Sequence, residues 1–242
     1  MEVVKKQAYG AGVMLLPALV VTMSLGAAAA PTAAEKDKPE IQVSEPEVSS
    51  MTDRRVGGVV APAALPAGAM SLYAMLGAPD LGGGFRQGLE KLEVEVKLMF
   101  NYLLASGVLE AGIRVPVYDK GMVQVAPTVA LGLEANSGSR YYDRANFGYI
   151  GVRPRVGLIT SLRFTDTVAG IVLFDLPWSI ALTSQGSHVV PTLGAGAEVH
   201  LGGNMSGFVM ANVGLDAIKE PLGVTQYRTG WAIRLGLGFR LF

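Results

Sequence analysis

The residues best suited to acid–base chemistry or metal binding in this chain are two histidines and their neighbours. His188 directly follows Ser187, and His200 stands two residues after Glu198. In an extended strand, side chains two apart share a face and adjacent ones point to opposite faces. Glu198 and His200 could therefore form a proton relay or half of a metal site, although an ordinary buried hydrogen bond is the commoner arrangement. Ser187 and His188 cannot act as one dyad unless a loop bends them together.

No enzyme motif accompanies these residues. The chain has no Walker loop, GxGxxG, HExxH or GxSxG pattern. It also has no cysteine, which excludes disulfides, thiolate metal sites and a cysteine nucleophile. Its 20 basic and 20 acidic residues give zero formal net charge, so no basic excess indicates a nucleic-acid partner. We predict that the protein is not an enzyme, uses no cofactor or metal, and binds no nucleic acid.

The amino-terminal region predicts export. Two lysines precede an apolar run that ends in small residues, which is the pattern of a secretory signal peptide. We predict a signal peptide over 1–30, cleaved between Ala28 and Ala34. The alternative is a retained transmembrane helix over 8–30, but its many Ala and Gly residues and its proline make it a weak span.

Two further regions follow the signal. Residues 31–67 are predicted as a disordered periplasmic linker, because Pro, Glu, Lys and Ser dominate up to residue 55 and offer almost nothing to bury. The stretch VGGVVAPAALP near the end of this linker has no clear interpretation. Residues 68–242 are predicted to form an outer-membrane β-barrel domain with core strands over 89–242.

The hydrophobic period from about residue 89 onward is two, which is typical of β-strands. The segment around VAGIVLF is apolar on both faces, and its phase is not defined. Counting that segment, the alternation predicts eight strands. They are KLEVEVKL, VLEAGIRVPV, MVQVAPTVALGLE, YIGVRPRVGL, the VAGIVLF stretch, TLGAGAEVHL, SGFVMANVGLD and GWAIRLGLGFRLF.

The connectors between these strands alternate in length. Tight ones are YDKG (118–121), SLRFTD (161–166) and GGN (202–204), and long ones are SGSRYYDRANF (137–147), LPWSIALTSQGS (176–187) and DAIKEPLGVTQYR (216–228). All tight turns fall at one end of the predicted sheet and the longer loops at the other. Transmembrane barrels have this asymmetry, with short periplasmic turns and longer outer loops.

The polar face of the strands carries charges of both signs in near balance. Its members are Lys91, Lys97, Arg114, Arg153, Arg155, Arg234 and Arg240 with Glu93, Glu95, Glu110, Glu134, Glu198 and Asp216, together with His200. A confined lumen requires charges to pair in this way. Aromatic residues stand at the strand ends and suggest interfacial girdles. These are Phe100, Tyr102, Tyr118, Tyr149, Phe164, Trp178, Phe208, Tyr227, Trp231 and Phe239. We therefore predict apolar side chains facing lipid and ionic ones facing the lumen.

Residues 89–242 resemble the small eight-stranded outer-membrane β-barrel proteins of Gram-negative bacteria. The features that carry the resemblance are the signal peptide, the alternation, the turn asymmetry and the terminal Phe242. The resemblance implies an all-β, antiparallel, up-and-down transmembrane β-barrel, surrounded by outer-membrane lipid and lipopolysaccharide. It also implies recognition of the C-terminal strand by the barrel-assembly machinery. The family's apolar residues fall in phase with the terminal aromatic, whereas here they occupy 233 to 241 at odd positions.

The stretch GAMSLYAMLGA (68–78) leaves the number of strands open. It also alternates, but counting it alone gives nine strands and places the amino terminus outside the cell. It is therefore either a periplasmic or lumen-inserted piece, or it pairs with 56–64 to give ten strands. The following APDLGGGFRQG is interpreted as a glycine-rich loop. We predict eight strands, which leave an interior just wide enough for side chains to fill, with ten as the alternative.

The loop 137–147 holds the predicted contact surface. Its members are Arg140, Tyr141, Tyr142, Arg144 and Phe147. Tyr and Arg are frequent interface anchors, so this loop could bind lipopolysaccharide or another protein. The alternative is an interfacial girdle with arginines toward anionic headgroups.

The predicted function is that of an outer-membrane barrel with a filled, charge-paired lumen. Its role would be structural or adhesive, with a surface or periplasmic protein as a candidate partner. Three alternatives remain open: a narrow outer-membrane pore, a soluble periplasmic lipocalin-like ligand binder, and a lipid-modifying outer-membrane enzyme that uses the outer-rim Ser187 and His188.

Overall fold

The computed structural model describes residues 58–241, which form antiparallel strands joined by turns and loops. The predicted signal peptide, most of the predicted linker and Phe242 lie outside the described residues. No helix among residues 58–241 is long and apolar enough to cross a membrane. The strands are β1 (Met70–Ala78), β2 (Asp80–Gly88), β3 (Glu93–Asn101), β4 (Ser106–Arg114), β5 (Tyr118–Lys120), β6 (Val123–Ser137), β7 (Gly148–Arg163), β8 (Val168–Ala181), β9 (Ser187–Val189), β10 (Thr192–Gly202), β11 (Met205–Lys219) and β12 (Thr225–Arg240).

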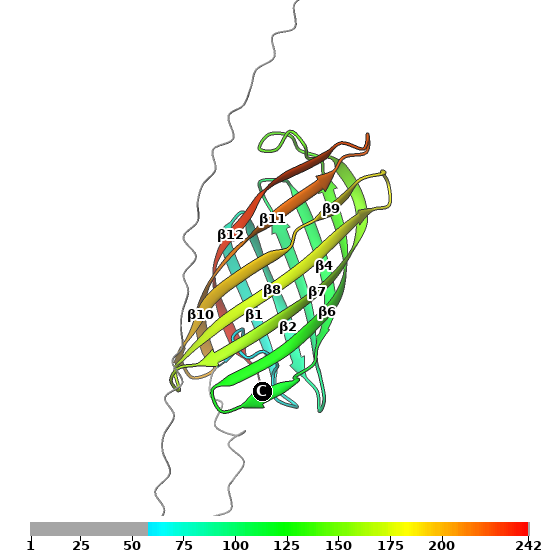
Figure 1. Cartoon of the computed structure of the whole chain (residues 1–242). Helices are drawn as coiled ribbons and strands as arrows, with labels where there is room; N and C mark the ends of the chain where they lie inside the picture. Colours follow the sequence, from blue (N-terminus) through cyan, green and yellow to red (C-terminus); the bar gives the residue numbers. More distant parts are fainter. Residues whose placement is uncertain (1–57, 242) are drawn as a thin grey trace, which may run out of the picture. The chain divides into compact units, whose positions relative to one another are not determined.

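Ten of these strands close into a ring (Figure 1). Each pairs antiparallel with its neighbours in chain order, and β1 closes the ring on β12 with Ser71 opposite Arg240. The three-residue β5 pairs with β6 beyond the end of β4, and β9 pairs with both β8 and β11 beyond the end of β10. These two short strands continue the positions of β4 and β10 in the ring. The ring therefore has no free edge among the described residues.

The prediction of eight strands is wrong, and ten strands form the ring. The additional strands are β1, which does not pair with 56–64, and β2, which was interpreted as a loop. Glycines hid β2, because Gly82, Gly83 and Gly84 remove the side chains that would show its alternation. The close packing of the wall explains Gly84, since a Cβ there would lie 2.6 Å from the hydroxyl of Tyr73.

The two ends of the ring differ, and we call them the base and the mouth. The base holds the turns 89–92, 121–122, 164–167 and 203–204, and both described chain ends, where the N–H of Leu241 donates to the carbonyl of Met70 at 2.8 Å. The mouth holds Pro79 and the connectors 102–105, 138–147, 182–186 and 220–224. The predicted length asymmetry is smaller than expected, because strands extend into much of 176–187 and 216–228.

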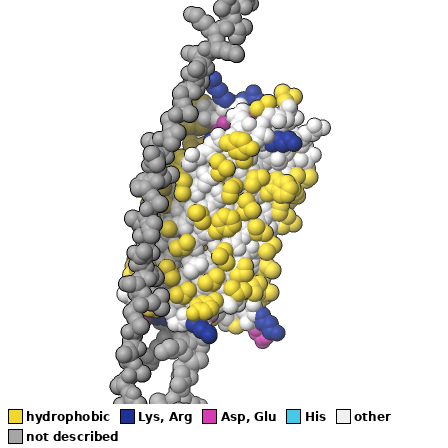
Figure 2. Space-filling view, viewed as in Figure 1, with side chains coloured by type: hydrophobic (Ala, Val, Ile, Leu, Met, Phe, Trp, Pro, Cys, Tyr) yellow, Lys and Arg dark blue, Asp and Glu magenta, His cyan; other side chains and the backbone are white. Residues whose placement is uncertain are grey.

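The outer wall of the ring is apolar, and the inner wall is ionic. Leu235 is 54% exposed on the outside, whereas Glu93 on the inside is fully buried. Every ring strand contributes exposed apolar side chains, among them Leu76, Leu81, Leu98, Leu109, Leu131, Ile150, Val172, Leu193 and Val213. Figure 2 shows hydrophobic side chains across the wall, with charged ones gathered near its two ends. The alternation predicted apolar side chains on the outside of the barrel and ionic side chains on the inside, and the structure has this arrangement.

Two of the aromatics predicted for the interfacial girdles face inward instead. Tyr149 and Phe208 are each only 5% exposed. Tyr149 packs against Phe147 inside the mouth, and Phe208 meets Tyr73 edge-to-face near the base, with ring centroids 6.3 Å apart. The other eight aromatics predicted for the girdles, including Trp178 and Trp231, are exposed on the outside.

Candidate functional site: the lumen and its plug

Residues 58–66 lie inside the base of the ring, and we call them the plug segment. Its residues Val59, Ala61, Ala63, Ala64 and Leu65 are buried. The segment is not paired as a strand, so its backbone N–H and C=O groups must find other partners. Three charged side chains from the surrounding wall bind four of the N–H groups and three of the carbonyls. This is the stretch VGGVVAPAALP that the sequence left without an interpretation.

Glu198 of β10 binds the amino-terminal half of the plug segment. Its Oε1 accepts the N–H of Val59 at 2.6 Å, and its Oε2 accepts those of Val60 at 2.8 Å and of Ala61. Ser206 of β11 also donates to this carboxylate. Successive N–H groups that converge on one carboxylate form charge-assisted hydrogen bonds, which are stronger than neutral ones. The predicted Glu198–His200 pair is therefore replaced by a contact between Glu198 and the plug segment.

Arg86 of β2 and Glu93 of β3 bind the rest of the segment. The Arg86 guanidinium donates to the carbonyls of Val59, Val60 (3.2 Å) and Pro62 (2.8 Å). It also makes a bidentate pair with Glu93 at 2.7 and 2.8 Å, and Glu93 accepts the N–H of Leu65 at 2.6 Å. Both side chains are fully buried. This pair satisfies plug backbone groups of both kinds without exposing a charge.

The plug segment touches opposite walls of the lumen. Val59 packs with Tyr73 and Phe208 on the side of β1 and β11. The alanines pack against β6, β7 and β8, where the inward apolar residues Ala126, Ile159, Ile171 and Leu173 form one cluster with Ala61, Ala63 and Ala64. This contact explains why the stretch around VAGIVLF is apolar on both faces: its inner face meets the plug segment, and Val172 and Phe174 face outward.

Two glycines of the wall make room for the plug segment. A Cβ on Gly238 would lie 2.4 Å from a methyl of Val59, and a Cβ on Gly88 would lie 2.0 Å from the carbonyl oxygen of Pro66. Both distances are far below van der Waals contact, so any larger residue would push the segment from its seat. The inner wall is shaped to the segment as well as charged to match it.

Above the plug segment, an ionic cluster spans β3, β4, β7 and β8. Arg155 reaches Glu110 at 2.8 Å and Asp175 at 2.7 Å, and Lys97 reaches the same Glu110 at 3.1 Å. Arg114 binds Glu95 at 2.8 Å and lies 3.5 Å from Glu93, which connects this cluster to the plug. Arg153 lies 3.7 Å from Glu134, and on the opposite wall Arg234 pairs with Asp80.

A second ionic cluster lies at the mouth. Nε2 of His188 on β9 contacts Asp216 of β11, which also accepts from Arg228 of β12. Arg228 in turn pairs with Asp143 in the loop 138–147. The cluster thereby ties the loop to three strands.

The loop 138–147 divides the predicted contact surface into two parts. Tyr141 (86% exposed) and Tyr142 point outward and form an edge-to-face pair with centroids 5.0 Å apart, with Arg140 and Arg144 also exposed. Phe147 is instead buried in the mouth, in a cluster with Ala145, Tyr149 and Ile218.

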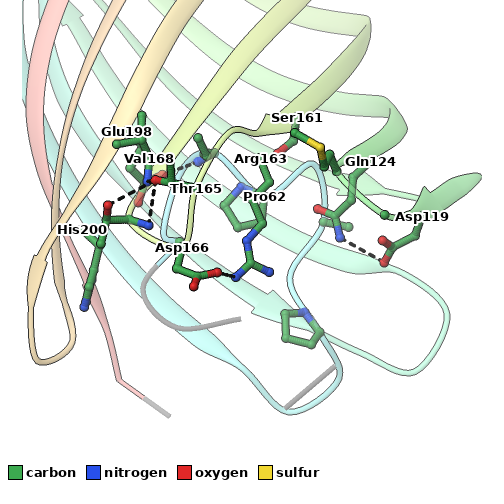
Figure 3. Close-up of a pocket in the computed structure, with 18 of the residues that line it drawn as sticks. Pro62, Asp119, Gln124, Ser161, Arg163, Thr165, Asp166, Val168, Glu198 and His200 are labelled. Carbon is green, nitrogen blue, oxygen red and sulfur yellow. Dashed lines mark hydrogen bonds and ion pairs between the residues drawn. The ribbon is translucent and has the colours of Figure 1, made fainter. Parts of the chain in front are cut away.

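The remaining predicted site residues lie at the base. Lys91 is exposed in the β2–β3 turn and makes none of the salt bridges described for residues 58–241. His200 and Arg240 line a pocket that opens beside the plug segment. In Figure 3, Pro62 lies between Glu198 and His200 on one side and Gln124 and Asp119 on the other. Within residues 58–241 no group of three or more metal-binding side chains is arranged for an ion.

Sequence reasoning missed four charged members of the lumen. Asp80 and Arg86 were hidden in the glycine-rich stretch, Asp175 in a strand of undefined phase, and Arg228 in a predicted loop. A local sign of Arg86 was present in GGGFRQG (82–88). There a bulky apolar residue, Phe85, is followed directly by a charged one, as in the alternating strands.

Comparisons with known proteins give structural neighbours but no family. No protein-family model matches this chain, and no curated protein matches its sequence significantly. Similar solved structures include the outer-membrane protease OmpT from Escherichia coli, with 7% identity over 72% of this chain and 93% of that one and a TM-score of 0.39. The KdgM porin has 8% identity over 71% and 98% with a TM-score of 0.40, and a bacterial polysaccharide outer-membrane secretin has 12% over 69% and 58% with a TM-score of 0.42.

Proposed function

We propose that this protein is an outer-membrane β-barrel with a closed lumen and a structural role in the cell envelope. The observation that carries the proposal is the plug segment, seated across the base of a ring whose outside is apolar and whose inside is ionic. A protein that only bound a greasy ligand would need the opposite arrangement, with an apolar interior.

The apolar outer wall supports the membrane location. Soluble monomers rarely expose contiguous apolar patches above a few hundred square ångströms, yet every ring strand here presents apolar side chains outward. In hydrocarbon an unpaired backbone group costs several kcal/mol, so a sheet in a membrane must close on itself. The ring of ten strands meets that requirement.

The lengths of the connectors support an orientation. The base carries the shorter turns and both described chain ends, so we place the base toward the periplasm and the mouth outward. The exposed Tyr141, Tyr142, Arg140 and Arg144 then lie at the cell surface, where they would contact lipopolysaccharide or another protein. The barrel-assembly machinery would recognise the protein through β12, the C-terminal strand of the ring.

Fractionation tests the proposed location. We expect the full chain in the outer-membrane fraction, released only by detergent, and we expect its mobility in SDS gels to change on boiling because closed barrels resist SDS until heated. Recovery in the soluble periplasm without detergent would contradict the proposal.

A closed lumen is tested in planar lipid bilayers. The unaltered chain should give no steady conductance, because the plug segment spans the base between opposite walls. The second candidate, a narrow open pore, is favoured by the partial exposure of Lys97, Arg153 and Asp175 within the lumen. Steady channels from the unaltered chain would favour that candidate.

A further inference from the structure

We call the wall residues that hold the plug segment its seat; they are Arg86, Glu93 and Glu198, with Gly88 and Gly238. The plug segment can leave this seat without breaking the ring. The hydrogen bonds of residues 58–65 run to the side chains of Glu198, Arg86 and Glu93, and none of them belongs to the ladder between the ring strands. The ring strands are held by their own backbone pairs on both sides. Withdrawal therefore costs the contacts of the seat alone.

We propose that the plug segment is the gate of a cation-conducting pore, which opens when the segment withdraws toward the periplasm. The proposal rests on the proposed function, since it requires the ring to lie in a membrane with its base inside. The segment packs on the β1 and β11 side through Val59 and on the β6 to β8 side through its alanines. Its removal would clear the cross-section between those walls at the base.

Glu198 sets the expected preference for cations. Its described partners are three N–H groups of the plug segment and the hydroxyl of Ser206, and no salt bridge within residues 58–241 includes it. Arg86 also loses plug contacts on withdrawal, but it keeps its bidentate pair with Glu93. The open base would therefore present a carboxylate that has lost its three N–H partners, which attracts cations and repels anions.

The seat recognises backbone groups more than side chains. It accepts four N–H groups and donates to three carbonyls, while Gly88 and Gly238 admit only a small, closely packed chain. A free peptide with the sequence GVVAPAALP (58–66) would therefore fit the empty seat and close the pore again. Access should be from the base only, because the ionic and mouth clusters lie on the other side.

The test is a deletion of residues 58–66 in the full chain, reconstituted in planar bilayers under a KCl gradient. We expect a gain of steady conductance with a reversal potential of the sign for cations. Peptide 58–66 added at the base side should abolish the conductance, and a peptide of the same composition in scrambled order should not. The deletion combined with Glu198→Gln should conduct with the cation preference lost.

Several results would overturn the gate. One is a deletion chain that still shifts on boiling, as a closed barrel does, yet does not conduct. Another is an anion preference, or a block by the scrambled peptide. The proposed function fails differently: there the unaltered chain is soluble or conducts steadily. The two failures are separated by the unaltered chain measured in parallel.

A disulfide lock keeps the proposal testable if the deletion does not fold. The chain has no cysteine. A Cβ on Gly238 would lie 2.7 Å from that of Val59, so a disulfide between the two positions would tether the segment beside the wall once the Cβ atoms move apart by about 1 Å. Glu198→Gln weakens the seat and should give openings in the full chain. In Glu198→Gln with Val59→Cys and Gly238→Cys, openings should vanish on oxidation and return with reductant, and the single cysteine variants should not respond. Openings that persist in the oxidised chain would contradict the gate.

Discussion

The base and the mouth of this barrel hold chain segments inside the ring in different ways. At the base a segment from outside the ring is held by wall side chains that bind its backbone, and Arg86 and Glu93 are fully buried there. At the mouth a connector of the ring itself folds inward, and side chains bind one another: Arg228, 34% exposed as a side chain, joins Asp143 to Asp216.

The two inserted segments are also connected to the ring in different ways. The loop 138–147 is joined to β6 and β7 at both ends, so its buried Asn146 and Phe147 only fix a conformation that the chain connection already favours. The plug segment is joined to the ring at β1 alone within the described residues. Its place therefore depends on the charged side chains of Glu198, Arg86 and Glu93.

The largest difference in unfolding free energy between the two ends is expected from replacing one arginine at each end. Arg86→Met leaves Glu93 and three plug carbonyls without a major donor, so we expect a loss of about 3–5 kcal/mol of unfolding free energy. Arg228→Met should cost less, about 1–3 kcal/mol, because solvent can replace part of its contacts. Urea unfolding in lipid vesicles measures both, and equal losses would contradict the comparison.

A smaller difference is expected from filling one glycine at each end. Gly238→Ala would meet Val59, and Gly186→Ala would meet the ring of Phe147 at 2.2 Å. Each should cost about 1–3 kcal/mol by overpacking, but only the first should displace the plug segment and make its residues open to protease from the base. Cleavage within 58–66 in both variants, or in neither, would count against the separate roles of the two ends.

The smallest effect on stability is expected from the exposed tyrosines. Tyr141→Ala should change the unfolding free energy by about 0.5 kcal/mol or less, because the side chain is almost wholly solvent-exposed. If the loop contacts lipopolysaccharide, the same variant should reduce binding to lipopolysaccharide-coated surfaces. Phe147→Ala is the buried comparison in the same loop, and it should destabilise the mouth by about 3–5 kcal/mol.

Much of the wall could be predicted from the sequence, because alternation is a local signal. Leu235 and Glu93 fall on the predicted sides. The number of strands could not be predicted, because the glycines in β2 remove the side chains that would show which face of the strand is apolar. Glycine is needed there for close packing against Tyr73, so the same physical requirement that builds the wall conceals it.

The contacts that hold the plug segment could not be predicted from the sequence for a different reason. Glu198 and the N–H of Val59 are separated by 139 positions, and nothing local in either stretch indicates their contact. The indirect sign was the stretch around Ile171, whose inner face is apolar in a lumen otherwise lined by charges. A two-sided apolar strand in a polar-lined barrel indicates that something apolar lies inside.

The most direct test of the central claim uses the two tryptophans of the chain. Trp178 and Trp231 are both exposed on the outer wall and are the only tryptophans present. In vesicles made with brominated phosphatidylcholine, the account predicts strong quenching of their fluorescence and little quenching by aqueous iodide. Fluorescence unchanged by brominated lipid and readily quenched by iodide would show the apolar wall facing water and would contradict the account.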